Sequence, residues 1–163
     1  MRRVHWVFAY GSNMHLPDLR CWLAAQGHPT DGILAAQPAA LDGYRLVWDY
    51  FSPARQGAAA NVAPAPGQTL LGVALQVDTP TLHAIDSKEG HPNRYHRGAA
   101  PLVARILAGG SVSVWLYRVL PLFRQAVAVR PRRAYLQLML QAAATHGLGD
   151  AYAAQLAATP TAD

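Results

Sequence analysis

Large apolar residues alternate with small or polar ones in several short segments of the first two thirds of the chain. Between residues 4 and 10, Val4, Trp6, Phe8 and Tyr10 stand at every second position, the two-residue repeat of a β-strand. Further strands are predicted at YRLVWDYF (44–51), AAANVAP (58–64), LLGVALQV (70–77), 95–106 and 111–119. We expect turns at Pro66-Gly67 and at Gly109-Gly110, between neighbouring strands.

Apolar residues recur at helical spacing in four other segments. The first helix begins near Pro17 and ends at Gly27, and the second begins with a capping Thr79 and ends near Gly90. Two more helices are predicted at 131–146 and 151–156. Strands dominate the first two thirds of the chain and helices the last third. This order predicts one α+β domain over residues 1–163, a small, partly closed barrel with helices packed around it.

Composition narrows the classes of function. The net charge is +5, but the arginines are scattered and only residues 130–133 form a basic cluster, so nucleic-acid binding is disfavoured and a small anionic substrate is favoured. The single cysteine, Cys21, excludes an intramolecular disulfide and fits a reducing cytoplasm. The N-terminus has the pattern of a first strand, and no apolar stretch is long enough for a membrane span. We therefore expect a cytoplasmic protein, a monomer or a homodimer, without a membrane partner.

The only glutamate of the chain, Glu89, stands on the apolar face of a predicted helix. Leu82, Ile85 and Glu89 are three and four residues apart, so they share one helix face, and that face must dock the helix. A carboxylate drawn away from water favours its protonated form and can serve as a general acid or base near neutral pH. The alternative is a carboxylate that stays in water or pairs with Lys88 or an arginine.

The tripeptide Gly11-Ser12-Asn13 directly follows the first predicted strand. A tight turn at this position can aim successive backbone N–H groups at one anion or at an oxygen that becomes negative during acyl transfer. Gly11 permits a positive φ angle and Asn13 tolerates one, which suits such a turn.

Together with the rest of the chain, these two stretches resemble the gamma-glutamylcyclotransferase family. The segments that carry the resemblance occur in the family's order over nearly the whole chain: FAYGSNM, GYRLVW, AANVAPAPG, LLGVALQV, LHAIDSKEG followed by RYHR, VWLYRV and AYLQLMLQAAATHGLGDAYAAQL. The resemblance implies a six-stranded barrel-like fold with flanking helices. It also implies Glu89 as the catalytic acid/base, the loop Tyr10, Gly11, Ser12 and Asn13 at the mouth of a pocket, and Tyr95 and Tyr117 as pocket aromatics.

The implied activity is release of 5-oxoproline from a gamma-glutamyl amino acid or a gamma-glutamylated metabolite. The substrate's own α-amine closes the ring, so neither a cofactor nor a metal is expected. The loop amides are expected to hold either the substrate carboxylate or the oxyanion. The YGSN form resembles this subgroup, whereas relatives that act on gamma-glutamylamines more often have Thr-Leu after Tyr-Gly.

The same residues allow other hypotheses about catalysis and metal binding. Ser12 lacks the GxSxG elbow of a serine nucleophile, and Cys21 falls among apolar residues, as a core thiol would. His91 and His96 with Glu89 match no common metal-site spacing. The rival functions are a non-catalytic small-molecule binder of the same fold and a hydrolase of gamma-glutamyl amides.

Overall fold

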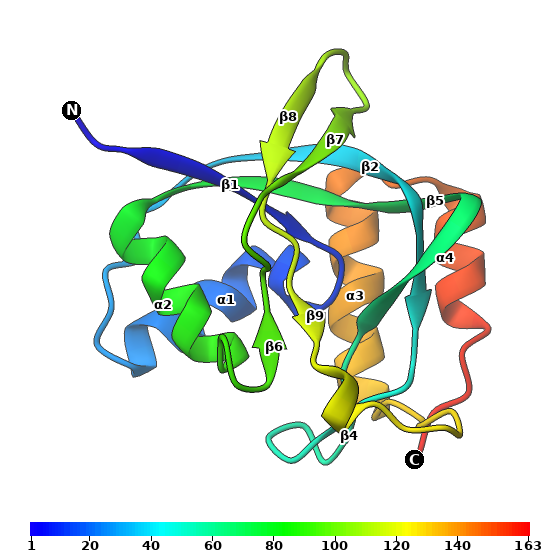
Figure 1. Ribbon diagram of the computed structural model, residues 1–163. Helices are drawn as coiled ribbons and strands as arrows, with labels where there is room; N and C mark the ends of the chain where they lie inside the picture. Colours follow the sequence, from blue (N-terminus) through cyan, green and yellow to red (C-terminus); the bar gives the residue numbers. More distant parts are fainter.

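The chain folds around one curved antiparallel sheet, in which two long strands, β2 and β5, pair along most of their length (Figure 1). The strand order is β1-β5-β2-β7-β8. The computed structural model describes all residues, 1–163. The elements are β1 (Val4–Ala9), η1 (Ser12–Met14), α1 (Leu16–Ala25), β2 (Ile33–Val47), β3 (Phe51–Ser52), β4 (Gly57–Ala58), β5 (Asn61–Asp78), α2 (Thr79–Glu89), β6 (Tyr95–His96), β7 (Leu102–Ile106), β8 (Ser111–Val114), β9 (Arg118–Val119), η2 (Pro121–Phe123), α3 (Arg133–His146) and α4 (Asp150–Ala157).

The two edges of the sheet meet just after β8. The amide of Trp115 donates to the carbonyl of Trp6 at 2.8 Å, and the amide of Phe8 donates to the carbonyl of Trp115 at 2.9 Å, which forms a short parallel bridge to β1. This bridge joins β1, at one edge of the sheet, to the segment that directly follows β8, at the other edge. The sheet therefore takes a barrel-like form with mixed strand directions. The predicted α+β class is therefore confirmed. The main sheet has five strands, and the remaining strands form two short pairs, β3–β4 and β6–β9.

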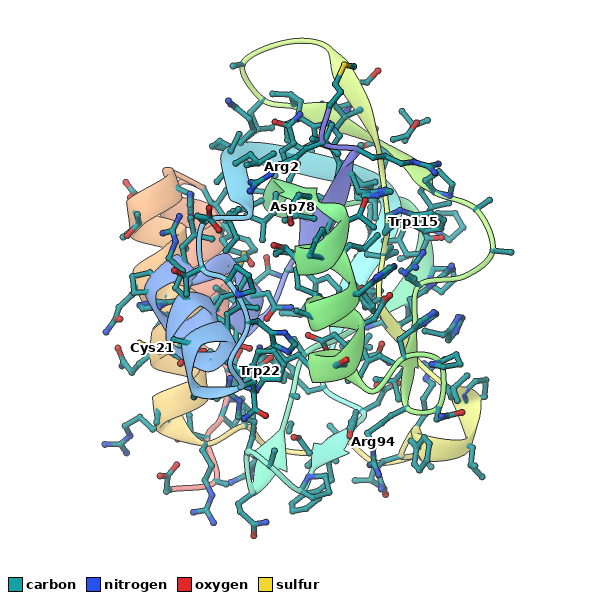
Figure 2. All side chains as sticks on the ribbon, turned by 90° about the vertical axis from the view of Figure 1, so that its left-hand side faces the viewer. Arg2, Cys21, Trp22, Asp78, Arg94 and Trp115 are labelled. Carbon is teal, nitrogen blue, oxygen red and sulfur yellow. The ribbon has the colours of Figure 1, made fainter.

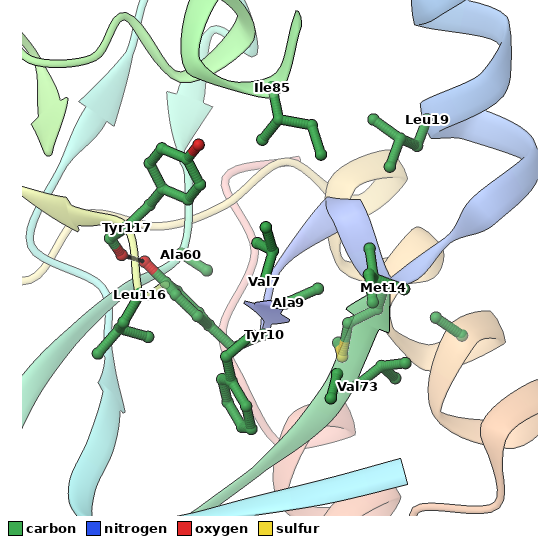
Figure 3. Close-up of a cluster of buried hydrophobic side chains, with 14 of the residues drawn as sticks. Val7, Ala9, Tyr10, Met14, Leu19, Ala60, Val73, Ile85, Leu116 and Tyr117 are labelled. Carbon is green, nitrogen blue, oxygen red and sulfur yellow. Dashed lines mark hydrogen bonds between the residues drawn. The ribbon is translucent and has the colours of Figure 1, made fainter. Parts of the chain in front are cut away.

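The core fills the space between the sheet and the helices, as Figure 3 shows for part of it. On β1 the expected alternation is lost after Trp6, because Val7, Phe8, Ala9 and the following Tyr10 are all buried. Both faces of this end of the strand are covered, so its side chains have no solvent side. On α2, Leu82 and Ile85 are buried as predicted, and they dock the helix.

One predicted turn is wrong. Pro66-Gly67 does not separate two strands, since β5 continues from Asn61 to Asp78. Both halves of β5 pair with the same partner, β2, as shown by Tyr44 opposite Pro64 and Asp42 opposite Thr69. Gly67, at φ +81°, lies where the register shifts, and Gly43 of β2 has φ +84°. The two glycines therefore bend a continuous ribbon instead of reversing the chain.

Two smaller expectations also need correction. The capping residue of α2 is Asp78 rather than Thr79, because the Asp78 carboxylate accepts from the amide of Thr81 at 3.0 Å. Cys21 is exposed on α1, not a core thiol, because α1 turns Leu19 and Leu23 to the core instead. None of the four helices is long and apolar enough to cross a membrane.

Candidate active site

A cavity of about 760 Å³ opens where the end of β1, the α1 helix and the C-terminal end of α2 come together. Its walls include residues of α1 such as Trp22, and Arg94 from the loop after α2; Figure 2 views the molecule from this side. A volume of this size is typical of small-molecule sites. All seven residues singled out from the sequence line it: Tyr10, Gly11, Ser12, Asn13, Glu89, Tyr95 and Tyr117.

Glu89 and Asn13 contact each other on the cavity wall. Glu89 is the last residue of α2, which ends at Gly90 in the left-handed conformation, and Asn13 lies in η1 just after β1. The side-chain amide nitrogen of Asn13 donates to Oε1 of Glu89 at 2.7 Å. The second carboxylate oxygen of Glu89 has no protein hydrogen-bond partner, so it is available to a molecule in the cavity.

The backbone amides of the Gly11-Ser12-Asn13 loop take no part in the backbone hydrogen bonding of the neighbouring strand and turns. The amide of Ser12 faces the hydroxyl of Tyr135. The amides of Gly11, Ser12 and Asn13 donate to no backbone oxygen, whereas those of Met14 and His15 close turns onto Gly11 and Ser12. The expected positive φ angles are absent, since φ of Gly11 is −113° and Asn13 is not among the positive-φ residues.

The reason for glycine at position 11 is close approach. A Cβ on Gly11 would lie 2.8 Å from the hydroxyl oxygen of Tyr135 and 3.1 Å from the Cβ of Ala60. The Tyr135 hydroxyl in turn accepts from the amide of Ala60 at 3.0 Å. The loop therefore packs directly against two residues that wall the cavity.

Three buried tyrosines fix the cavity wall through their hydroxyls. Tyr10 donates to the carbonyl of Tyr117 at 2.6 Å (Figure 3), and Tyr95 donates to the carbonyl of Ala60 at 2.8 Å. Tyr117 donates to the carboxylate of Asp86 at 2.5 Å. Burial raises the pKa of all three phenols, so they stay protonated and act as donors at neutral pH.

Several cavity residues were not anticipated from the sequence. The guanidinium of Arg55 contacts Oγ of Ser12 and the carboxylate of Asp18, both at 3.3 Å, and lies over the ring of Tyr135. Arg94 donates to the hydroxyl of Tyr50 at 3.1 Å. In the sequence these are two of many scattered arginines, and no local pattern marks them as cavity residues.

Lys88 does not form the ion pair with Glu89 that the sequence left open as an alternative. Its Nζ donates to Oδ1 of Asn13 at 2.6 Å and forms no ion pair. Asn13 therefore stands between the only lysine and the only glutamate of the chain.

The residues considered for a nucleophile or for a metal site make other contacts. The hydroxyl of Ser12 contacts Arg55 instead of a histidine base. Cys21 lines the cavity rim from the exposed side of α1. His91 accepts from the amide of Arg97 at 3.3 Å, and no group of three His, Cys, Asp or Glu side chains is arranged to hold a metal ion.

The sequence matches the model of one protein family, described as gamma-glutamyl cyclotransferase, AIG2-like, over residues 7–137. That range contains every candidate site residue named above, and it confirms the resemblance identified from the sequence. No curated protein matches the sequence.

Solved structures show the same fold at low sequence identity. A gamma-glutamyl cyclotransferase superposes with a TM-score of 0.82 and 18% identity, covering 99% of this chain and 90% of its own. A human protein, loc79017, whose structure is described as that of an uncharacterized protein, gives 0.77 and 21%, covering 98% and 90%. A yeast gamma-glutamyl cyclotransferase specific to glutathione gives 0.60 and 14%, covering 94% and 93%.

Proposed function

Because the chain belongs to the gamma-glutamyl cyclotransferase, AIG2-like family, we propose that it releases 5-oxoproline and a free amine from a gamma-glutamyl amide. One observation carries the proposal: the only glutamate of the chain borders a cavity and is held there by Asn13 of the YGSN loop at 2.7 Å.

The reaction uses the substrate's own nucleophile. The α-amine attacks the γ-carbonyl carbon, a new C–N bond closes a five-membered ring, and the amide bond to the leaving nitrogen breaks. Folding the substrate inside the cavity brings the two reacting atoms together, which supplies much of the rate enhancement. No serine, cysteine or metal is required for this step.

Glu89 moves the proton in this scheme. It takes a proton from the attacking nitrogen and returns it to the leaving nitrogen, using the oxygen that Asn13 does not occupy. The amides of Gly11 and Asn13, which donate to no backbone oxygen, offer donors to a negatively charged oxygen of the substrate. The protonated tyrosines keep the wall rigid, since each hydroxyl is already bonded within the protein.

The test is to incubate the protein with a panel of gamma-glutamyl amino acids, gamma-glutamylamines and glutathione, and to identify the products by mass spectrometry. We expect 5-oxoproline with an equal amount of the freed amine. Free glutamate in place of 5-oxoproline would instead establish a hydrolase, and no product from any substrate would favour a binding function.

The charge of the cavity favours a leaving amine that carries a carboxylate. Arg55 is already paired with Asp18, but Arg94 has no carboxylate partner and is held by the hydroxyl of Tyr50 and by the ring of Phe123, 4.7 Å away. A guanidinium fixed in this way is ready to bind a carboxylate. We propose that the leaving group is an amino acid or a peptide.

This preference can be measured in the Arg94→Met variant. A hydrogen bond to a charged group contributes about 1.5–3 kcal/mol, so we expect KM for a gamma-glutamyl amino acid to rise about 10-fold or more. For a gamma-glutamylamine, whose leaving amine carries no carboxylate, KM should stay within about 2-fold, because no charge pair with the leaving group is lost. Equal changes for both substrates would remove Arg94 from leaving-group recognition.

A further inference from the structure

Lys88 and Glu89 are linked through one asparagine side chain. Nζ of Lys88 donates to Oδ1 of Asn13 at 2.6 Å, and Nδ2 of Asn13 donates to Oε1 of Glu89 at 2.7 Å. Lys88 is partly buried, lines the same cavity and is the only lysine in the chain. The proposed proton-transfer scheme assigns it no role.

The direction of these bonds follows from the chemistry of the three groups. An ammonium has only donors, so the oxygen of the Asn13 amide must face Lys88. The nitrogen of that amide then faces Glu89 and can only donate to it. The Asn13 amide therefore occupies Oε1 of Glu89 and leaves the other carboxylate oxygen free for the cavity.

The surrounding charges leave Lys88 free for this contact. Besides Glu89 on its own helix, the charged groups that act on Lys88 are Asp18 of α1 and Arg55 of the β3–β4 turn, and those two pair with each other at 3.3 Å. The titratable groups that face Glu89 are the buried tyrosines Tyr10, Tyr95, Tyr117 and Tyr135. Burial lowers the pKa of Lys88, and the neighbouring Glu89 carboxylate opposes this shift.

We propose that Lys88 is a positioning residue for the acid/base: it orients the side-chain amide of Asn13 so that Asn13 holds one oxygen of Glu89 and leaves the other for proton transfer. This inference rests on the proposed function of Glu89. It assigns Lys88 no contact with the substrate, so its loss should affect the chemical step and not substrate affinity.

The kinetic test compares Lys88→Met with Lys88→Arg. Methionine keeps the unbranched apolar stem and removes the donors, whereas arginine keeps a cation that can donate to Asn13. For Lys88→Met we expect kcat to fall about 10- to 100-fold, the loss typical when an orienting partner is removed, with KM changed less than about 3-fold. The low-pH limb of kcat should move to higher pH, because a positive charge next to the carboxylate is gone. Lys88→Arg should recover at least part of kcat.

The matched control removes a cation elsewhere. Arg45 is exposed on β2 and lies outside the cavity, so Arg45→Met should leave kcat and the pH profile unchanged. An unchanged kcat and pH profile in Lys88→Met would overturn the inference. So would an effect confined to KM, because it would show that Lys88 contacts the substrate instead of orienting Asn13.

A second measurement does not depend on turnover. The chain has three asparagines, Asn13, Asn61 and Asn93, so the side-chain amide signal of Asn13 can be assigned by NMR with an Asn13→Ala variant. In the wild-type protein this signal should shift as Glu89 titrates, and Glu89→Gln should abolish the shift. In Lys88→Met the shift should be reduced at least about 2-fold, since the amide is no longer fixed. An unaltered shift would overturn the inference even if no substrate is found, whereas missing 5-oxoproline alone would count only against the proposed function.

Discussion

The Glu89→Gln variant should lose turnover and keep its fold. Glutamine has nearly the shape of glutamate, and its side-chain oxygen can still accept from Nδ2 of Asn13, as Oε1 of Glu89 does at 2.7 Å. Only the ability to take up and return a proton is removed, so kcat should fall by a factor of about 100 to 10,000. The rate of 5-oxoproline release measures this effect, and substrate binding by calorimetry should be largely retained.

The matched control for this variant is Asp150→Asn. Asp150 is an exposed carboxylate in the first turn of α4, outside the cavity, and its neutralisation should leave kcat unchanged. If Glu89→Gln retained the wild-type rate, Glu89 would not be the acid/base, and the proton would have to move through another group of the cavity. If it failed to bind substrate, the carboxylate would serve binding as well as chemistry.

The second large effect is expected for Gly11→Ala. The added methyl would lie 2.8 Å from the hydroxyl oxygen of Tyr135 and 3.1 Å from Cβ of Ala60, distances that force the neighbours to move. Such overpacking costs about 1–3 kcal/mol of the free energy of unfolding, which urea denaturation can measure. Because the same shift displaces the loop that carries Asn13, we also expect kcat/KM to fall about 100-fold.

Combining Gly11→Ala with Tyr135→Phe tests whether the contact with the Tyr135 hydroxyl causes the destabilisation. Removing the hydroxyl takes away the closest contact of the new methyl, so Gly11→Ala should be less destabilising there by at least about 0.5 kcal/mol. Tyr135→Phe alone loses the bond from the amide of Ala60, and this cost is subtracted in the double-mutant cycle. Strictly additive effects would mean that the contact with Tyr135 is not the reason for glycine at position 11.

Local sequence patterns predicted the secondary structure correctly where residues close together in the chain determine it. The alternation in residues 4–10 predicts β1, and the spacing of Leu82, Ile85 and Glu89 predicts which face of α2 docks. Both periods are properties of the backbone itself, so they can be read along the chain without knowledge of the fold. The left-handed glycine that ends α2 is of the same kind.

Predictions from local sequence patterns were wrong where contacts with residues distant in the chain determine the local structure. Pro66-Gly67 has the residues of a turn, but pairing of both halves of β5 with β2 keeps the strand continuous. Glycine at position 11 suggested a positive φ angle. It is needed instead because a side chain there would collide with Tyr135, which lies 124 positions later in the chain. Cys21 has apolar neighbours, but the packing of α1 turns it outward.

The sequence by itself determined the class of fold, the YGSN loop and the glutamate that faces inward, because these depend on short periodicities and on motifs that also mark the family. Only the tertiary structure decided that Asn13 joins Lys88 to Glu89, that Arg55 and Arg94 border the same cavity, and that Tyr117 holds Tyr10. Each of these contacts spans dozens of residues. Such contacts form only after the sheet has curved and brought β1 to the end of α2, and no local pattern encodes that approach.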